Sequence, residues 1–106
     1  MSKILLKNYK LLIKEGKRLK NKYYLFFILK ISKGKGCILK ASVKKKVGIA
    51  VKRNYEKRII RIMLKKFNYN NDLFILCICL RKPEMIFSEK YKLFKETLKD
   101  YIKDYS

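Results

Sequence analysis

Three arginines lie close together in the stretch VGIAVKRNYEKRIIR, which covers residues 47–61. They are Arg53, Arg58 and Arg61, and the whole chain has only five arginines among its 29 basic residues. A guanidinium presents five donors in a planar fork that matches the paired oxygens of a phosphate or the edge of a base, whereas an ammonium group acts as a point charge. Arginine used three times against a lysine background therefore indicates a geometric requirement, and phosphate or base recognition would meet it.

A helical projection brings these arginines to one side of a helix predicted over residues 52–66. At about 100° per residue, six of its basic and amide side chains fall within an arc of roughly 140°. That arc contains Arg53, Asn54, Lys57, Arg58, Arg61 and Lys65. The opposite side is apolar and is expected to pack on a sheet; it contains Tyr55, Ile59, Ile60, Ile62, Met63 and Phe67, while Leu64 strays into the basic arc.

The basic side has two explanations, a solvated surface or a binding face. A helix stabilised by solvent would mix charges four residues apart, but this arc is positive throughout and repels itself without an anionic partner. Asn54 adds a donor and an acceptor that suit a base or sugar edge. We therefore interpret the arc as a binding face for RNA or DNA. The preceding lysines, Lys44, Lys45 and Lys46, with Gly48 as a flexible point, add weaker support.

The bulk composition agrees with a polyanionic partner. The chain has 106 residues and a net charge of +21, and 49% of its residues are hydrophobic. This length permits one domain, covering residues 1–106, with a single modest core. A compact body with so much positive charge is relieved of self-repulsion when it binds phosphates and releases their counterions.

Several other classes of protein fit poorly. The chain has no histidine, and its eight acidic residues are scattered, so a protein-based hydrolytic centre is not expected. Cys77 and Cys79 lie in the apolar run LFILCICL and are interpreted as buried free thiols, so no metal site is predicted. The longest apolar runs fall well short of the ~20 residues that span a bilayer, and lysines interrupt the N-terminal segment, so a cytoplasmic protein is expected.

The remaining segments predict an α+β fold, a small two-layer sandwich with helices packed on a sheet. In order, we expect a helix over 4–15 that ends before Gly16, strands over 23–31 and 37–43 paired as a hairpin, with or without a further short strand, the helix over 52–66, a strand over 73–80, and a C-terminal helix. The strand over 73–80 is almost continuously apolar, which predicts a central strand buried on both faces. Ser88 is the expected N-cap of the last helix.

The stretch KKKVGIAVKRNYEKRIIR resembles the signature of the protein subunit of bacterial ribonuclease P. The matching positions are Lys45, Lys46, Val47, Gly48, Ala50, Val51, Arg53, Asn54, Lys57, Arg58 and Arg61. An early tyrosine, Tyr9, an aromatic strand around Tyr24 and an amphipathic C-terminal helix extend the likeness over nearly the whole chain.

The resemblance implies a subunit of an endoribonuclease that removes the 5′ leader of precursor tRNA, with catalysis carried by an RNA. It implies that the basic loop and helix dock on the catalytic RNA, and we add Lys65, which lies on the same arc. It also implies a cleft between the first helix and the sheet that holds the leader, with Tyr9, Ile13, Tyr24 and, less closely matched, Phe26 and Ile28. A left-handed βαβ crossover and Mg²⁺ held mainly by the RNA complete the expectation, with catalytic RNA and precursor tRNA as partners and no protein partner or membrane required.

Two alternatives stay open from the sequence. A ribosomal or other structural RNA-binding protein would share the charge and the basic helix, but would not stimulate tRNA processing. A cationic membrane-surface protein would need the apolar side of the basic helix to be free for insertion.

Overall fold

A four-stranded sheet forms the centre of the computed structural model, which describes residues 10–103. The strands are β1 (Lys17–Lys20), β2 (Tyr24–Lys30), β3 (Ile38–Val43) and β4 (Leu73–Cys79), and the helices are η1 (Lys45–Val47), α2 (Ala50–Lys66) and α3 (Phe87–Thr97). A further helical segment occupies residues 10–15 and ends before Gly16, as predicted. The α+β class is confirmed, but the additional short strand is β1, which precedes β2, whereas the predicted order placed an optional strand after the strand over 37–43.

The strand order is β1-β2-β4-β3, so β4 lies between β2 and β3. It pairs antiparallel with β2, where Ile28 is opposite Ile75, and parallel with β3, where Leu39 is opposite Ile75. The predicted hairpin of β2 and β3 is therefore wrong, because the apolar β4 takes the position between them. The prediction of a central strand buried on both faces is confirmed.

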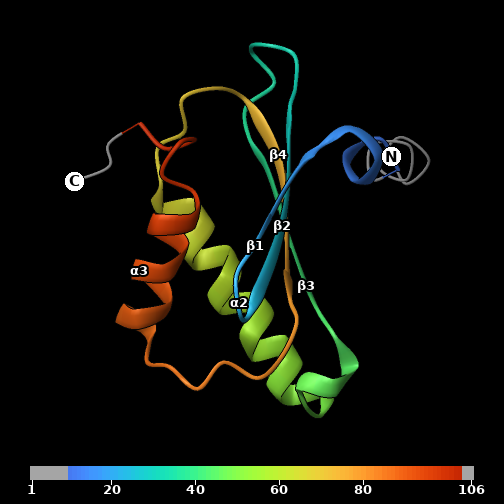
Figure 1. Cartoon of the computed structure of the whole chain (residues 1–106), viewed down its shortest axis with the longest axis vertical. Helices are drawn as coiled ribbons and strands as arrows, with labels where there is room; N and C mark the ends of the chain where they lie inside the picture. The colour runs from blue at the N-terminus through green and yellow to red at the C-terminus, as the bar shows by residue number, and fades with distance from the viewer. Residues whose placement is uncertain (1–9, 104–106) are drawn as a thin grey trace.

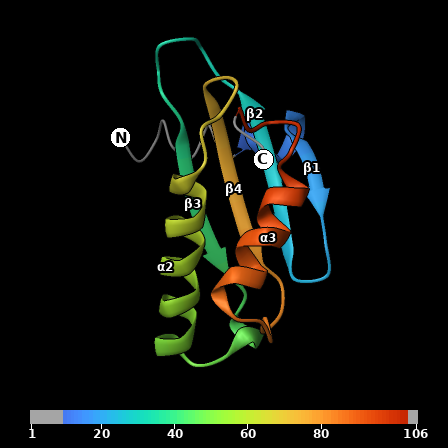
Figure 2. The same ribbon diagram turned by 90° about the vertical axis from the view of Figure 1, so that its left-hand side faces the viewer.

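The connection from β3 through α2 to β4 is the crossover of a βαβ unit. Figure 2 shows α2 in front of the sheet, β3 and β4 both running downward, and β4 to the right of β3. This arrangement is a left-handed crossover, the rare hand for such units. The expectation drawn from the family resemblance is confirmed in this respect.

Different segments of the chain pack on the two faces of the sheet. Helices α2 and α3 pack on one face, and the segment 10–15 lies on the other (Figure 1). Side chains alternate along a strand, so Tyr24, Phe26 and Ile28 point toward α2 and α3, where they are buried in the main core. Leu12 from the segment 10–15 packs with Phe74 and Leu76 on the opposite face.

Aromatic contacts and one ion pair fix α3 against the sheet and α2. The ring of Phe94 meets the rings of Tyr24 and Phe26 edge to face, with centroid distances of 4.7 and 5.0 Å. Lys90 on α3 is buried, and its Nζ lies 3.1 Å from Oε1 of Glu56 on α2. The predicted N-cap, Ser88, is wrong by two positions: the helix begins after Ile86, whose N–H donates to the Glu89 carboxylate.

Candidate nucleic-acid interface

The buried side of α2 is narrower than predicted and is shifted around the helix. Ile59, Ile60, Met63 and Leu64 are its buried residues. Leu64 was expected within the basic arc, but it is fully buried. Tyr55 and Ile62 were expected against the sheet, but they are 53% and 41% exposed. The α2 helix therefore rests on the sheet through a band centred on Ile60, and its solvent side carries apolar as well as basic groups.

The exposed part of the basic arc is formed by Asn54, Arg58, Arg61 and Lys65. We call these four residues the basic face of α2. Arg53 and Lys57 are half-buried at the margin of this face. The Nε of Arg53 is buried and has no hydrogen-bond partner within residues 10–103. The structure thus brings two of the three arginines together in solvent and turns the third toward the protein.

No carboxylate of residues 10–103 pairs with the guanidinium of Arg53, Arg58 or Arg61. Glu56 is the one acidic residue of α2, and its carboxylate is occupied by Lys90 on the buried side of the helix. The basic face is therefore rigidly presented by a packed helix and is left unneutralised by the described part of the protein. A surface of this kind attracts phosphates, and its arginines can hold them through two parallel hydrogen bonds.

A short basic segment leads into α2. Val47 is buried and anchors η1, whereas the side chains of Lys45 and Lys46 are exposed. Gly48 follows with φ 157° and ψ −167°, a conformation that side-chain-bearing residues rarely adopt. This glycine lets the chain turn directly from η1 into α2, so that both lysines lie next to the start of the helix.

The predicted leader-binding residues do not form one surface. Tyr9 lies outside the described residues, and Ile13 is 57% exposed. Tyr24, Phe26 and Ile28 were also expected in the cleft, but all three are buried beneath α2 and α3 on the face away from the segment 10–15. Burial raises the pKa of the Tyr24 hydroxyl, which has no hydrogen-bond partner among the described residues.

The opposite face of the sheet presents the alternate residues instead. Phe27, Leu29 and Ile78 are half-buried there and pack around Phe74 and Leu76. Residues opposite each other in register share a face, so Arg18 lies beside Phe27, and Lys40 lies beside Leu76. We call this surface the cleft face: an apolar strip with cations from both edge strands. Sequence reasoning missed it because both faces of β2 are apolar, so the pattern did not say which face α2 and α3 would cover.

Other kinds of site find no support in residues 10–103. No group of three or more His, Cys, Asp or Glu side chains is placed to hold a metal ion in this range. Cys77 and Cys79 are buried free thiols, as predicted, and burial raises the pKa of both, that of Cys79 to about 11. None of the helices in the described range is long and apolar enough to span a membrane.

Comparison with known proteins identifies the family. The ribonuclease P family model matches residues 6–105. The chain belongs to the ribonuclease P protein family. The known role of this family is the 5′ processing of tRNA. No curated protein sequence matches the chain significantly.

Solved structures of family members show the same fold. The ribonuclease P protein of Staphylococcus aureus is 26% identical, with a TM-score of 0.75, and the match covers 89% of this chain and 88% of that protein. The ribonuclease P protein of Thermotoga maritima is 27% identical, with a TM-score of 0.73, and the match covers 90% of this chain and 93% of that protein. The matches cover most of both chains, so the likeness includes the crossover that carries α2.

Proposed function

We propose that this protein is the RNA-binding subunit of a ribonuclease P whose RNA performs the cleavage. In this proposal the basic face of α2, together with Lys45 and Lys46, docks on the catalytic RNA. The observation that carries it is the unneutralised pair of exposed arginines, Arg58 and Arg61, on a helix held by the core. Membership of the family supports the same assignment.

The cleft face is the proposed contact for the 5′ leader of precursor tRNA. Phe27 offers a partly exposed ring beside Arg18, and the aliphatic side chains of Leu29 and Ile78 continue the strip. Bases of any sequence can stack on an aromatic ring, and each such contact is worth about 1–3 kcal/mol. Cations along both edges suit the backbone of a single strand, so this surface would hold leaders of varied sequence.

The protein would act by binding and not by chemistry of its own. RNA phosphates, and not residues of this chain, would hold most of the Mg²⁺, which when bound would supply activation of the attacking water. The lysines and arginines of the two surfaces would reduce the repulsion between substrate and catalytic RNA, since each contact offsets phosphate charge. The expected result is tighter substrate binding and a lower requirement for Mg²⁺.

Reconstitution with a bacterial ribonuclease P RNA tests this function. We expect the protein to stimulate cleavage of a precursor tRNA at the mature 5′ end at Mg²⁺ concentrations where the RNA alone is slow. Arg58→Gln/Arg61→Gln should remove most of this stimulation. Binding to ribosomal RNA without any stimulation would instead identify a structural RNA-binding protein, and preferential binding to anionic vesicles would point to a membrane surface.

A further inference from the structure

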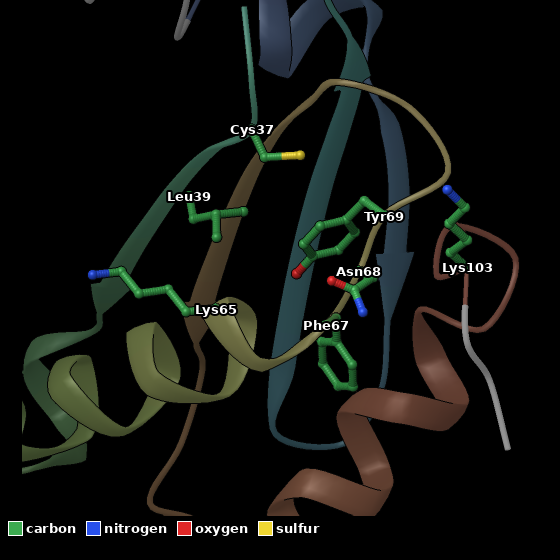
Figure 3. A pocket seen from close by; sticks show the side chains of 7 residues that line it. All are labelled: Cys37, Leu39, Lys65, Phe67, Asn68, Tyr69 and Lys103. Carbon is green, nitrogen blue, oxygen red and sulfur yellow. The ribbon is translucent and has the colours of Figure 1, made fainter.

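A pocket of about 690 Å³ opens where the C-terminal end of α2 approaches the start of β3 (Figure 3). Its lining residues come from three separate segments of the chain, residues 37–39, 65–69 and Lys103. They are Cys37, Leu39, Lys65, Phe67, Asn68, Tyr69 and Lys103. In Figure 3, Lys65 and Lys103 lie on opposite sides of Tyr69 and Cys37, and the Lys65 side chain extends away from them.

The walls of this pocket are held in place by two hydrogen bonds and a ring contact. The Tyr69 hydroxyl donates to the backbone carbonyl of Leu64 at 2.6 Å, which fixes the ring against the end of α2. The ring of Phe67 stacks on Tyr91 of α3, with a centroid distance of 5.1 Å. The N–H of Lys103 donates to the carbonyl of Asn68 at 2.5 Å. The pocket is therefore formed before any ligand arrives.

The chemistry of the lining favours an anion that also carries an apolar, planar part. Lys65 and Lys103 are the two basic residues of the lining, and none of its lining residues within the described chain is acidic. Leu39, Phe67 and Tyr69 provide apolar and aromatic surface between them. A nucleotide combines a phosphate with a base that packs on such surfaces.

The pocket continues the basic face of α2. Arg58, Arg61 and Lys65 follow one another at helical spacing, so an RNA backbone bound to both arginines is led toward the end of the helix. Lys65 belongs to the basic face and also lines the pocket. The ligand best placed to enter is therefore part of the RNA that occupies α2.

We infer that this pocket binds one unpaired nucleotide of the catalytic RNA, with its phosphate beside Lys103 and its base against Tyr69 and Leu39. This inference rests on the proposed function, because it assumes that the RNA docks on α2. It adds a second contact, made by the segment after α2 and the C-terminal Lys103.

The first test compares two lysines near the C-terminus. Lys103→Gln removes a charge from the pocket, whereas Lys99→Gln removes an exposed charge that does not line it. With a bacterial ribonuclease P RNA as the probe, we expect Lys103→Gln to raise the Kd by about tenfold. It should also reduce the slope of log K against log salt concentration by about 0.7–0.9. Lys99→Gln should change neither quantity appreciably.

The second test uses Cys37, the exposed cysteine of the three. We expect bound RNA to protect Cys37 from a thiol reagent, and N-ethylmaleimide attached to Cys37 beforehand to weaken RNA binding by a similar factor. Cys37→Ser treated with the same reagent is the control. Cys37 that reacts equally fast in the complex would overturn the inference.

The outcomes separate this inference from the proposed function. If Arg58→Gln/Arg61→Gln loses RNA binding and Lys103→Gln has no effect, the proposed function would stand and the pocket would be excluded as a nucleotide site. An effect of Lys103→Gln only on the affinity for precursor tRNA would also overturn the inference, because it would assign the pocket to substrate. Failure of the unmodified protein to bind the RNA would overturn both proposals.

Discussion

Phe26 and Phe27 are neighbours in the chain, yet their side chains lie on opposite faces of the sheet. Phe26 is fully buried against Phe94, whereas Phe27 remains half-buried on the cleft face. The two residues therefore form a matched pair in which one side chain lies in the main core and the other lies on the surface that we propose to bind the leader.

Substitution of these two phenylalanines should have opposite consequences. Phe26→Ala should lower the free energy of unfolding by about 3–5 kcal/mol, because it leaves a cavity in the core. Phe27→Ala should cost much less stability, but should weaken binding of a precursor tRNA with a leader by about 1–3 kcal/mol. Urea unfolding and binding to matched substrates with and without a leader measure the two effects. Equal weakening for both substrates would remove Phe27 from the leader site.

Arg58 tests whether geometry matters beyond charge. Arg58→Lys preserves the charge on the basic face but removes the planar fork. We expect a loss of affinity for the catalytic RNA of about 1 kcal/mol or more, the difference between a paired and a single charged hydrogen bond. Lys66→Arg, an exposed change on the same helix but outside the basic face, is the control. Unchanged binding by Arg58→Lys would mean that charge alone suffices.

The three thiols should differ sharply in reactivity. Cys37 is exposed, whereas burial raises the pKa of Cys77 and Cys79 and keeps both protonated at neutral pH. Because the thiolate is the reactive form, a thiol reagent at pH 8 should modify one cysteine in the native protein and three in denaturant. Rapid modification of all three under native conditions would contradict the placement of β4 in the core.

The α2 helix depends on α3 for the position of its single carboxylate. Lys90 holds Glu56 through contacts of 3.1 and 3.4 Å, and its Nζ also lies 5.9 Å from the centre of the Tyr55 ring. Without Lys90, the Glu56 carboxylate would be buried and unpaired, or would turn toward Arg53 one helical turn earlier. The pair therefore both joins the helices and keeps a negative charge away from the arginines.

Removal of one partner should be more harmful than removal of both. Lys90→Met should lower the free energy of unfolding by about 3–5 kcal/mol, because it leaves a buried charge without a partner. Glu56→Leu/Lys90→Met should recover most of that loss, since apolar side chains of similar size can replace a buried pair. Denaturant unfolding of both variants provides the measurement, and an equally unstable double variant would show that the loss comes from packing.

For the helices and strands, the sequence predicted the boundaries well, but it did not predict which strands pair or which face of the sheet the helices cover. The apolar run from Leu73 identified a central strand, and the periodicity after Ala50 identified α2. The neighbours of β4 were not predictable from local patterns, because pairing of β3 with β4 joins segments separated by a whole helix. The sequence also did not predict which face of β2 packs against α2 and α3, because Phe26 and Phe27 are equally apolar.

Over the whole molecule, charge dominates the behaviour in solution. A net charge of +21 on 106 residues makes every association with RNA depend strongly on salt. Much of this charge is spread over exposed lysines outside the proposed surfaces, such as Lys33 and Lys92. Such lysines support nonspecific attraction, whereas the basic face and the pocket would provide a defined orientation.

Salt titration distinguishes these two contributions. Arg58→Gln/Arg61→Gln should reduce the slope of log K against log salt concentration by about 1.4–1.8, because each lost phosphate contact contributes about 0.7–0.9 to that slope. Lys33→Gln/Lys92→Gln removes the same charge elsewhere and should leave the slope for the catalytic RNA nearly unchanged. Equal flattening by both pairs would mean that the RNA samples the whole surface without a fixed site.

The central position of β4 in the sheet affects how the nascent chain can fold during translation. Residues 1–72 include most of the lysines, but the strand that must join β2 to β3 is not yet present, and α2 has no complete sheet on which to rest. A nascent chain that lacks β4 would therefore carry most of the lysines without the folded surface that positions them. Its unpaired strand edges would make it prone to aggregation. We expect specific RNA binding only after the chain up to Cys79 is available to fold.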